Sequence, residues 1–547
     1  MPLSRRTLLS SALAGTAAAA VGGTELVSAF TSSASAASAA GDVVGKITVG
    51  YQGWFACIGD GAPIDAWWHW SQNEGQAPSP SNENIKAWPD MTIYSKGYQT
   101  GYANLGDGAA ATLFSSYDQS TVNEQFALMQ QNGCDTAALQ RFDPNGGEGP
   151  TRNAITAKVN TAAQAYDRKF YIMYDATGWT NMVTEMPADW TNVMSQYASS
   201  PAYAHQNGKP VVGIWGFGFN DTNHPWSAAD CLSVVQWFES QGCYVMGGVP
   251  TYWRTGVSDS RAGYLGVYSA FNMISPWMVG RIGSVADSNN FYTTVNVGDQ
   301  AYCNSNGIDY QPCVLPGDLS ANQRAHGDFM WAQFYNMVRV GAQGIYISMF
   351  DEYGEGNQIL NTAPTTAQVP TGSGLLALDE DGTACSADYY LRLTDDGGRM
   401  LKGQIALTAT RPTSPESGTS TSSPTPTPTG TATAGCGAMT ANQQITVNQS
   451  ILSCDGRFQL VLGGDGNLVL YEGSTALWSA GTAGKASARA TMQGDGNFVI
   501  YDANSNALWA SNTAGNNGAS LSVQDDGNTV IYSTSGAALW STGTAGH

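Results

Sequence analysis

Short runs of apolar residues recur along the first three quarters of the chain, and polar stretches of helical length separate them. Eight of these runs have the length of a buried strand, roughly four to eight residues. We predict strands at 47–53, 136–141, 170–175, 211–215, 243–247, 273–276, 313–315 and 344–349. Amphipathic segments, for example at 122–132, 226–241 and 327–340, predict helices between them. This alternation over residues 41–410 predicts an α/β fold, a (β/α)8 barrel of the TIM type.

Residues 436–547 follow a different pattern, in which the turn sequence Asp-Gly-Asn precedes a short alternating run that ends in Tyr. The pattern occurs three times with a period of 30 to 31 residues, and Ala-Leu-Trp follows each run. The three tryptophans are Trp478, Trp509 and Trp540. A turn followed by alternation predicts hairpins. Three copies predict a small all-β domain with threefold pseudo-symmetry around the tryptophan rings.

Two segments are predicted to lie outside both domains. Residues 411–435 contain mainly Pro, Thr and Ser, a composition that cannot build a core and is typical of an extended linker. Residues 1–40 contain a twin-arginine pair, Arg5-Arg6, then an Ala-rich apolar stretch and small-residue cleavage sites. They predict an export signal of the twin-arginine type, and hence a secreted protein. No later run of ~18 apolar residues predicts a transmembrane helix.

The charge of the chain excludes some classes of partner. The formal net charge is −20, from 23 Lys and Arg against 43 Asp and Glu, and only 12% of residues are charged. A chain with this negative charge would repel nucleic acids and anionic membrane surfaces. Sixteen Trp and 25 Tyr, with much uncharged polarity, suit a neutral ligand rich in hydroxyl groups. We therefore expect a polysaccharide or glycan as the partner.

Nine cysteines in an exported chain predict disulfide bonds. Their spacing makes Cys231–Cys243, Cys303–Cys313 and Cys436–Cys454 the natural pairs, and at least one of the remaining three should be free. Those three are Cys57, Cys134 and Cys385. The chain has five His and no zinc-type motif, so we expect neither a metal nor a cofactor.

The candidate catalytic groups follow the last predicted strand. Asp351, Glu352 and Glu355 come directly after the apolar run 344–349. Carboxylates next to a buried strand are costly unless they face a polar cleft, and cleavage of a glycosidic bond needs two of them. Glu352 and Glu355, three apart on a turn, are therefore the predicted catalytic pair. A solvated acidic loop or a calcium-type oxygen cluster stays open as an alternative.

Other polar and aromatic residues lie at the ends of the predicted strands, where barrel enzymes place their reactive groups. Each one alone is more often a packing residue, but together they suit a sugar cleft. The predicted substrate-binding residues are Tyr51, Trp54, Gln140, Arg141, Asp175, Trp215, Trp253, Trp277 and Asp351.

The C-terminal repeats resemble bulb-type (monocot mannose-binding) lectins, whose pocket motif is Gln-x-Asp-x-Asn-x-Val-x-Tyr. This resemblance implies a β-prism II fold and mannose pockets. The second and third repeats match the motif fully, with Gln493, Asp495, Asn497, Val499, Tyr501, and Gln524, Asp526, Asn528, Val530, Tyr532. The first repeat keeps Asp465, Asn467, Val469 and Tyr471 but has Gly463 in place of Gln. That departure puts its pocket in doubt. The alternative is that Asp and Asn only close turns.

The segment from Met349 to Ile359 resembles the catalytic loop of glycoside hydrolase family 71/99-like proteins, which include the family 99 endo-α-mannosidases. The sequences Tyr-Gln-Gly-Trp-Phe at 51–55 and Ile-Ser-Pro-Trp at 274–277 support the resemblance. It implies that Glu355 is the general acid/base and Glu352 the base that assists the sugar's own 2-hydroxyl. Configuration would be retained through a 1,2-anhydro sugar.

The favoured hypothesis is thus a secreted, retaining glycoside hydrolase acting on α-mannan or an α-mannoside, with a mannose-binding module for targeting. Other interpretations stay open. One is a non-catalytic mannose-binding protein, and another is a lectin-type antagonist of other microbes with the barrel as scaffold. A third is a xylosidase-, arabinosidase- or α-glucanase-type glycosidase on the same barrel.

Overall fold

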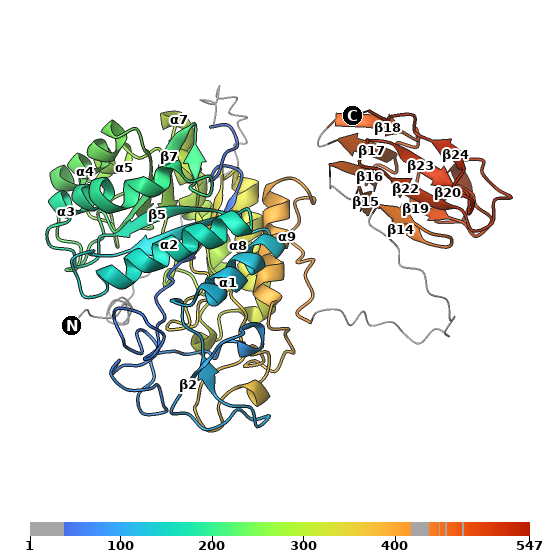
Figure 1. The fold of residues 1–547 in the computed structure, drawn as a ribbon. Helices are drawn as coiled ribbons and strands as arrows, with labels where there is room; N and C mark the ends of the chain where they lie inside the picture. The colour runs from blue at the N-terminus through green and yellow to red at the C-terminus, as the bar shows by residue number, and fades with distance from the viewer. Residues whose placement is uncertain (1–37, 417–436, 448, 454–456, 473–474, 547) are drawn as a thin grey trace, which may run out of the picture. The chain divides into compact units, whose positions relative to one another are not determined.

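The computed structural model describes residues 38–416, 437–447, 449–453, 457–472 and 475–546. The chain divides into two compact units, Met1–Thr421 and Ser422–His547, and each is described by itself (Figure 1). Most of the predicted linker and almost all of the predicted export signal lie outside the described residues.

A parallel sheet forms the centre of the first unit, in the order β10-β9-β8-β7-β5-β4-β1-β12-β11. Its strands are β1 (Ile47–Tyr51), β4 (Thr136–Arg141), β5 (Lys169–Asp175), β7 (Lys209–Trp215), β8 (Tyr244–Val249), β9 (Met273–Pro276), β10 (Asp309–Tyr310), β11 (Cys313–Val314) and β12 (Ile345–Ile347). The short β6 (His205–Gln206) pairs antiparallel with β7, and β2 (Tyr98–Gln99) forms a separate hairpin with β3 (Thr112–Leu113). Most strand residues are buried, as expected of parallel strands covered on both faces.

The two ends of this strand order lie on one short stretch of chain. Only Gln311 and Pro312 separate β10 from β11, yet β10 pairs with β9 and β11 pairs with β12. The first strand in sequence also pairs with the last, with Ile47 opposite Ile345. This parallel sheet fits a TIM-type barrel, in which the carboxyl ends of all strands face the same side.

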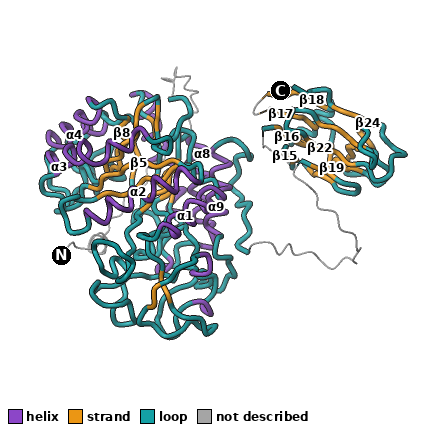
Figure 2. Tube along the Cα trace, viewed as in Figure 1, coloured by secondary structure: helices purple, strands orange, loops and turns teal. Residues whose placement is uncertain are grey.

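Helices separate most of the consecutive strands, and Figure 2 shows them on the outside of the sheet. They are α1 (Gln119–Gln131), α2 (Gly149–Ala165), α3 (Met182–Asp189), α4 (Ala228–Ser240), α5 (Leu265–Tyr268), α6 (Val285–Phe291), α7 (Val297–Asn306), α8 (Asp328–Val340) and α9 (Tyr389–Leu401). Short 3₁₀ segments are η2 (Met91–Ile93), η4 (Ser195–Ser199), η6 (Leu319–Ala321), η7 (Ala325–Gly327) and η8 (Thr366–Gln368), and π segments are η3 (Trp190–Met194) and η5 (Tyr292–Asn296).

All eight predicted strands are confirmed, and two match to the residue, at 136–141 and 273–276. The first strand ends at Tyr51 and not at Gly53. The reason is that the N–H groups of Gln52 and Gly53 donate to Asp351 and that Gly53 has a φ of +56°, so the chain leaves the sheet there. The three predicted helices are confirmed as α1, α4 and α8; both ends are shifted in α1 and α4, and only the first end in α8.

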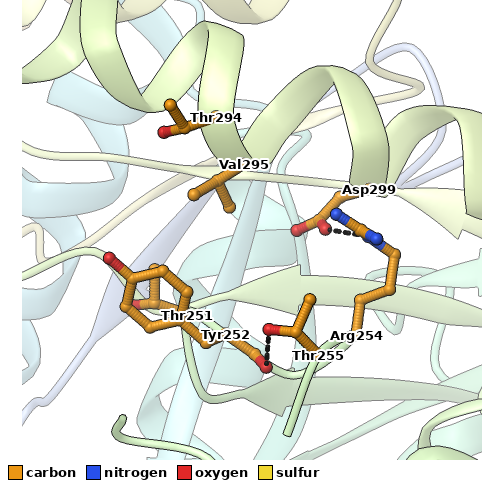
Figure 3. Close-up of a pocket in the computed structure, with 7 residues that line it drawn as sticks. All are labelled: Thr251, Tyr252, Arg254, Thr255, Thr294, Val295 and Asp299. Atoms are coloured by element: carbon orange, nitrogen blue, oxygen red, sulfur yellow. Dashed lines mark hydrogen bonds and ion pairs between the residues drawn. The ribbon is translucent and has the colours of Figure 1, made fainter. Parts of the chain in front are cut away.

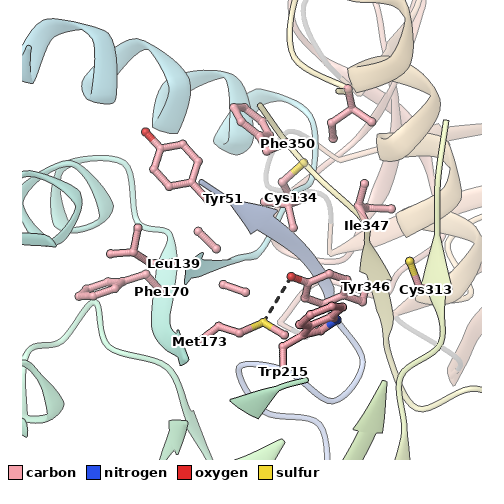
Figure 4. Packing of buried hydrophobic residues seen from close by; sticks show 14 of the residues in the cluster. Tyr51, Cys134, Leu139, Phe170, Met173, Trp215, Cys313, Tyr346, Ile347 and Phe350 are labelled. Atoms are coloured by element: carbon pink, nitrogen blue, oxygen red, sulfur yellow. Dashed lines mark hydrogen bonds between the residues drawn. The ribbon is translucent and has the colours of Figure 1, made fainter. Parts of the chain in front are cut away.

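A dense aromatic core fills the first unit (Figure 4). Tyr51, Met173, Tyr346 and Phe350 are at most 1% exposed and come from strands or strand ends far apart in sequence. Inside the sheet, the hydroxyl of Tyr346 lies 3.4 Å from the sulfur of Met173. The predicted strand ends are therefore held against one another by packing.

Two of the predicted disulfides are wrong, because Cys231, Cys243, Cys303 and Cys313 are all free and buried. Cys231 lies in α4 and Cys243 lies beyond its end, and a helix of that length separates them by roughly 15 Å at ~1.5 Å per residue. Cys303 lies on α7 and Cys313 in β11, in different layers. Cys57, Cys134 and Cys385 are also free and buried. The pair Cys436–Cys454 lies outside the described residues.

The second unit contains three four-stranded antiparallel sheets. Their orders are β13-β22-β23-β24, β14-β19-β20-β21 and β15-β16-β17-β18. The strands are β13 (Ala438–Met439), β14 (Gln444–Thr446), β15 (Ser450–Leu452), β16 (Phe458–Leu462), β17 (Leu468–Glu472), β18 (Thr475–Ser479), β19 (Ser487–Met492), β20 (Phe498–Asp502), β21 (Ala507–Ala510), β22 (Ser520–Val523), β23 (Thr529–Tyr532) and β24 (Ala538–Ser541). The rings of Trp478, Trp509 and Trp540 meet one another edge to face, with centroids 5.5–5.6 Å apart. The predicted all-β character and the meeting of the tryptophans are confirmed.

Within the described ranges, no helix combines the length and the apolar character that crossing a bilayer requires. The same residues contain no cluster of three or more His, Cys, Asp or Glu side chains arranged to hold a metal ion.

Candidate functional site

The acidic loop begins where β12 ends, at the carboxyl side of the sheet. Asp351 and Glu352 are buried, at 0% and 2% exposed, and Glu355 is half-buried. The loop lies beside the long segment that follows β1, since the N–H of Lys86 donates to the carbonyl of Tyr353 at 2.9 Å. The predicted catalytic pair therefore lies in a structured loop packed on the first unit, and Glu355 is the more accessible of the two.

Asp351 has a structural role in this loop. Its Oδ1 accepts the N–H of Gln52 and its Oδ2 accepts the N–H of Gly53, each at 2.8 Å. Burial raises the pKa of Asp351 to about 6, although these N–H groups lower it. Both carboxylate oxygens thus brace the end of β1, which makes Asp351 an anchor of the loop.

Glu352 is held by the same turn of β1. The Nε2 of Gln52 donates to its Oε2 at 3.3 Å. A Cβ atom at Gly354 would lie 2.9 Å from the Oε1 of Glu352, so this carboxylate lies directly against the backbone of its own loop. The hydrogen bond from Gln52 thus holds Glu352 at the end of β1.

Arg324 holds the far side of the loop. Its Nη2 donates to the carbonyls of Gly356 and Gln358, each at 2.9 Å, and its Nε donates to Gly317 at 3.0 Å. The guanidinium lies 4.3 Å from the ring centroid of Tyr390 and is buried, which lowers its pKa. No local pattern around Arg324 predicts this role, because the residue lies more than 30 positions before the carbonyls that it binds.

Arg152, at the start of α2, joins the ends of two strands. Its Nη1 donates to the carbonyl of Gln52 at 3.4 Å and to that of Gln140 at 3.0 Å, and its Nε pairs with Glu148 at 2.6 Å. The guanidinium also lies 4.5 Å from the ring centroid of Phe142. Arg152 was not among the predicted site residues. It orders the backbone of Gln52, whose side chain donates a hydrogen bond to Glu352.

Two of the predicted substrate-binding residues lie close to Gln52 and Arg152. Trp54 is 9% exposed, stacks on His69 with centroids 3.7 Å apart, and lies beside Phe142. The Nε2 of Gln140 points to Tyr346, at 3.3 Å from its hydroxyl. The structure thus brings Trp54 and Gln140 to the strand ends around Gln52.

Three other predicted residues form side-chain contacts with helices of the outer layer. Arg141 forms a bidentate ion pair with Asp189 of α3. The Nε1 of Trp253 donates to Asp299 of α7 at 2.9 Å, and the hydroxyl of Tyr51 donates to Gln125 of α1 at 2.6 Å. All three contacts are with residues of helices. Arg141 and Trp253 are not brought to the acidic loop, whereas the ring of Tyr51 also packs against Phe350 at the start of that loop, with centroids 6.0 Å apart.

Asp175, Trp215 and Trp277 lie at the ends of β5, β7 and β9. Asp175 accepts from the hydroxyl and the N–H of Thr177, and that hydroxyl lies 3.1 Å from His224. Trp215 and Trp277 meet edge to face at 5.6 Å. A cavity of about 450 Å³ opens beside them, between the loops after β5 and β7. It is lined by Gly178, Thr180, Thr222, Asn223, Pro225, Trp226, Ser227 and Asp230.

A second cavity, of about 20 Å³, is shown in Figure 3. Arg254 pairs with Asp299 at 2.9 Å on one side of it, and Tyr252 and Thr294 lie on the other. Burial raises the pKa of Asp299 to about 7. This cavity has room for about one water molecule, so it does not suit a sugar.

In the second unit, each complete motif forms a continuous polar patch on one sheet. Along β20, Phe498 and Ile500 face the core, while Val499 and Tyr501 lie on the other face. The Nε2 of Gln493 donates to the hydroxyl of Tyr501 at 2.7 Å. The third repeat has the same arrangement, with Gln524 and Tyr532 at 3.0 Å. In the first repeat Gly463 supplies no such donor to Tyr471.

The Asp and Asn residues of the motifs also close turns. The Oδ1 of Asp495 accepts the N–H of Asn497 at 3.0 Å, and the Oδ1 of Asn497 accepts the N–H of Thr513 at 3.1 Å. Asp526 and Asn528 do the same in the third repeat. Among the described residues, the Oδ2 of Asp495 and the Nδ2 of Asn497 take part in no hydrogen bond. The turn contacts therefore leave one acceptor and one donor group for a ligand.

Comparison with known proteins distinguishes the two units. No family model matches the chain. The B-type lectin plumieribetin of Scorpaena plumieri is 33% identical over 66 residues, which are 12% of this chain and 58% of that lectin. A monocot mannose-binding lectin of Gastrodia elata is 39% identical over 20% of this chain and 97% of its own, with a TM-score of 0.19. The GH99 endo-α-mannosidase of Bacteroides thetaiotaomicron is 13% identical over 66% of this chain and 98% of its own, with a TM-score of 0.49. The chain is thus similar to bulb-type mannose-binding lectins in its C-terminal region and to a GH99 endo-α-mannosidase over 66% of its length.

Proposed function

We propose that the protein is an exported glycoside hydrolase that cleaves a mannose-containing polysaccharide, and that its second unit binds mannose and holds the enzyme on that substrate. In this proposal the sheet of the first unit closes into a complete (β/α)8 barrel, and the second unit is a β-prism with threefold pseudo-symmetry. Residues 1–40 direct export through the twin-arginine pathway.

The observation that carries the proposal is the pair of glutamates on the braced loop after β12. Glu352 is buried and held by Gln52, whereas Glu355, three residues on, is half-buried. Two carboxyl groups in different surroundings are what an acid and a base in one site require. Glu355 protonates the leaving oxygen, and Glu352 takes the proton from the 2-hydroxyl of the sugar, which attacks its own anomeric carbon. Water then opens the 1,2-anhydro sugar with retention of configuration.

The choice of mannose rests on the second unit. Its two complete motifs offer amide, carboxylate and phenol groups beside a buried valine, which suits the hydroxyls and the apolar face of a pyranose. The lectin of Gastrodia elata is named as mannose-binding, so mannose is the sugar to test first. The GH99 neighbour is named an endo-α-mannosidase, which makes internal cleavage of α-mannan the specific form of the proposal.

The test is incubation of the full chain with a panel of α-mannans and xylans, with the products identified by mass. We expect oligosaccharides from α-mannan and none from xylan. The variant Glu352→Gln/Glu355→Gln should release nothing, while Glu239→Gln, at an exposed position of α4, should behave as the native chain does. Release from xylan alone would replace the substrate, and release by the double variant would contradict the assigned site.

The binding role has its own test, retention on immobilised mannan. Gln493→Ala with Gln524→Ala should abolish retention, because both substitutions remove a group of the pocket without touching the turn contacts of Asp and Asn. Unchanged retention would mean that the sugar binds elsewhere.

A further inference from the structure

The three motif patches of the second unit differ in the residue that lies across the sheet from their tyrosine. In the second repeat Arg489 of β19 is paired with Tyr501 of β20. In the third repeat Ser520 is paired with Tyr532, and in the first Gln459 is paired with Tyr471. The second repeat also has a register shift beside Arg489, between Ser487 and Arg489, which the other two repeats lack, so the pockets differ at this position in both side chain and backbone.

Arg489 is a cation that forms no ion pair within 4.0 Å with any carboxylate of the described residues, although it lies close enough to Asp502 to lower the pKa of that carboxyl group. Its Cζ lies 4.9 Å from the ring centroid of Tyr501, its Nη2 donates to the hydroxyl of Ser505 at 3.0 Å, and the side chain is half-exposed. A guanidinium stacked on a ring keeps N–H groups in its plane that can bind a further acceptor.

Asp502 is the carboxylate near Arg489, but among the described residues its oxygens accept hydrogen bonds from Asn504 and Asn506 and none from the guanidinium. Asp502 accepts hydrogen bonds from Asn506 and Asn504, which lower its pKa, and Arg489 adds a smaller effect in the same direction. Asp495, the acid of the pocket itself, lies at the turn, and Arg489 lies opposite the tyrosine at the other end of the motif. The second pocket therefore has a negative end and a positive end.

We propose that the second pocket prefers a mannoside that carries an anionic substituent, a phosphate or a carboxylate, and that the third pocket takes the neutral sugar. This inference rests on the proposed mannose binding of the second unit. Gln493 and Tyr501 hold the sugar, and the anionic group lies away from Asp495, where the guanidinium of Arg489 binds it with two N–H groups. The third pocket has no cation at the corresponding position, since Ser520 stands there.

The test uses the full chain with one pocket left intact. The variant Gln524→Ala keeps only the second pocket complete, and the variant Gln493→Ala keeps only the third pocket complete. Binding of methyl α-mannoside and of mannose 6-phosphate is measured by calorimetry at about 20 mM and about 300 mM salt. For the chain with the second pocket we expect mannose 6-phosphate to bind about fivefold tighter at low salt, the upper range for an exposed ion pair, and the preference to shrink at high salt.

Matched variants come from the other repeats. In the chain with the second pocket, Arg489→Gln copies the first repeat and should remove the preference, and Arg489→Lys should keep part of it. In the chain with the third pocket, Ser520→Arg should create the preference.

Methyl α-mannuronoside distinguishes a carboxylate from a phosphate as the anionic group. Equal preference for both ligands means that the pocket recognises the negative charge alone, and preference for the phosphate alone means that it recognises the geometry of that group. Equal affinity of the second pocket for neutral and phosphorylated mannose would overturn the inference. If the unaltered chain binds neither sugar, the proposed mannose binding fails instead.

Discussion

At the scale of single residues, the two glutamates of the acidic loop differ in ways that suit different tasks. Glu352 is 2% exposed and receives a hydrogen bond from Gln52, whereas Glu355 is half-buried. A base that acts on one hydroxyl of the bound sugar needs a fixed position, and an acid that serves the leaving group must reach the open side of the site.

Substitution of each glutamate by Gln should lower the rate about 10²–10⁴-fold, the usual effect of losing a general acid or base. The two variants should respond differently to a substrate with a good leaving group. Glu355→Gln should regain part of its rate, because such a group departs without protonation, and Glu352→Gln should not. Steady-state rates on aryl and alkyl mannosides measure the difference. A 2-deoxy substrate cleaved at the normal rate would contradict the role of the 2-hydroxyl.

Asp351 should give the first unit an unusual dependence of stability on pH. Burial raises its pKa to about 6, above the ~3.9 of an exposed Asp in the unfolded chain. Its contribution to the free energy of unfolding is therefore fully present below about pH 4 and is lost as the pH rises through 6, by about 3 kcal/mol in total. We expect the melting temperature of the first unit to fall between pH 4 and pH 7.

The variant Asp351→Asn is the control for this effect. Its amide nitrogen would face a backbone N–H, so the variant should be less stable at every pH, but its melting temperature should change less between pH 4 and pH 7. A slope equal to that of the native chain would assign the effect to other groups. Glu380, whose pKa burial raises to about 7, acts in the same direction.

The residues that sequence reasoning placed correctly are those whose neighbours in sequence already define them. Asp351 and Glu352 follow a buried strand and do lie at its carboxyl end. A position at or beyond the end of a strand does not determine the direction of the side chain. Arg141 and Trp253 were therefore predicted to bind substrate, although their side chains contact helices. Arg152 had no local signal, because its role depends on carbonyls of two other strands.

At the scale of elements, the loop from Ser348 to Gln358 is an irregular segment that is tied down at both ends. Asp351 fixes its first part to β1, and Arg324 fixes its last part through the carbonyls of Gly356 and Gln358. Irregular backbone in the interior must have its carbonyls satisfied, and here one buried guanidinium does this for the acidic loop.

Arg324→Gln should therefore loosen the loop without removing any group that touches the sugar. We expect kcat to fall about 100-fold, the effect of misplacing a catalytic group by roughly 1 Å, with a smaller change in KM. Arg399→Gln, which breaks a half-exposed ion pair of α9, is the matched control and should leave kcat unchanged. Native kcat in Arg324→Gln would mean that the loop holds its shape by itself.

Strands were easier to predict than helices in this chain. Buried parallel strands are continuous apolar runs, so the pattern alone marks them. α2 (Gly149–Ala165) gives a weaker signal, because Ala and Thr make up much of it and leave only a weak apolar stripe. The pairs Cys231–Cys243 and Cys303–Cys313 were wrong for a related reason, since the spacing of two cysteines in the sequence does not give their distance in space.

At the scale of the whole molecule, each unit has its own apolar core, and the chain between them is rich in Pro and Thr. The first unit extends to the start of this segment, because Pro415 accepts hydrogen bonds from Ser386 and Arg392, and Thr413 donates to Asp396. A truncation that respects these contacts removes residues 417–547.

This truncation should leave turnover of short soluble mannosides unchanged and slow the attack on insoluble mannan about tenfold, because the tethered binding unit raises the local concentration of the enzyme. Rates of product release from both substrates, measured at equal enzyme concentration, test this. An equal loss on both substrates would indicate that the two units share one site.

The pairing of β1 with β12 has a consequence for how the protein is made. Ile47 and its partner Ile345 are about 300 residues apart, so at roughly 5–20 residues per second the ribosome delivers β12 about 15–60 s after β1. During that time one edge of β1 has no neighbour, and an open edge pairs readily with other chains. The first unit therefore spends much of its synthesis with one edge of its first strand unpaired. Slower elongation lengthens this interval, and with it the time in which the strand can pair with other chains.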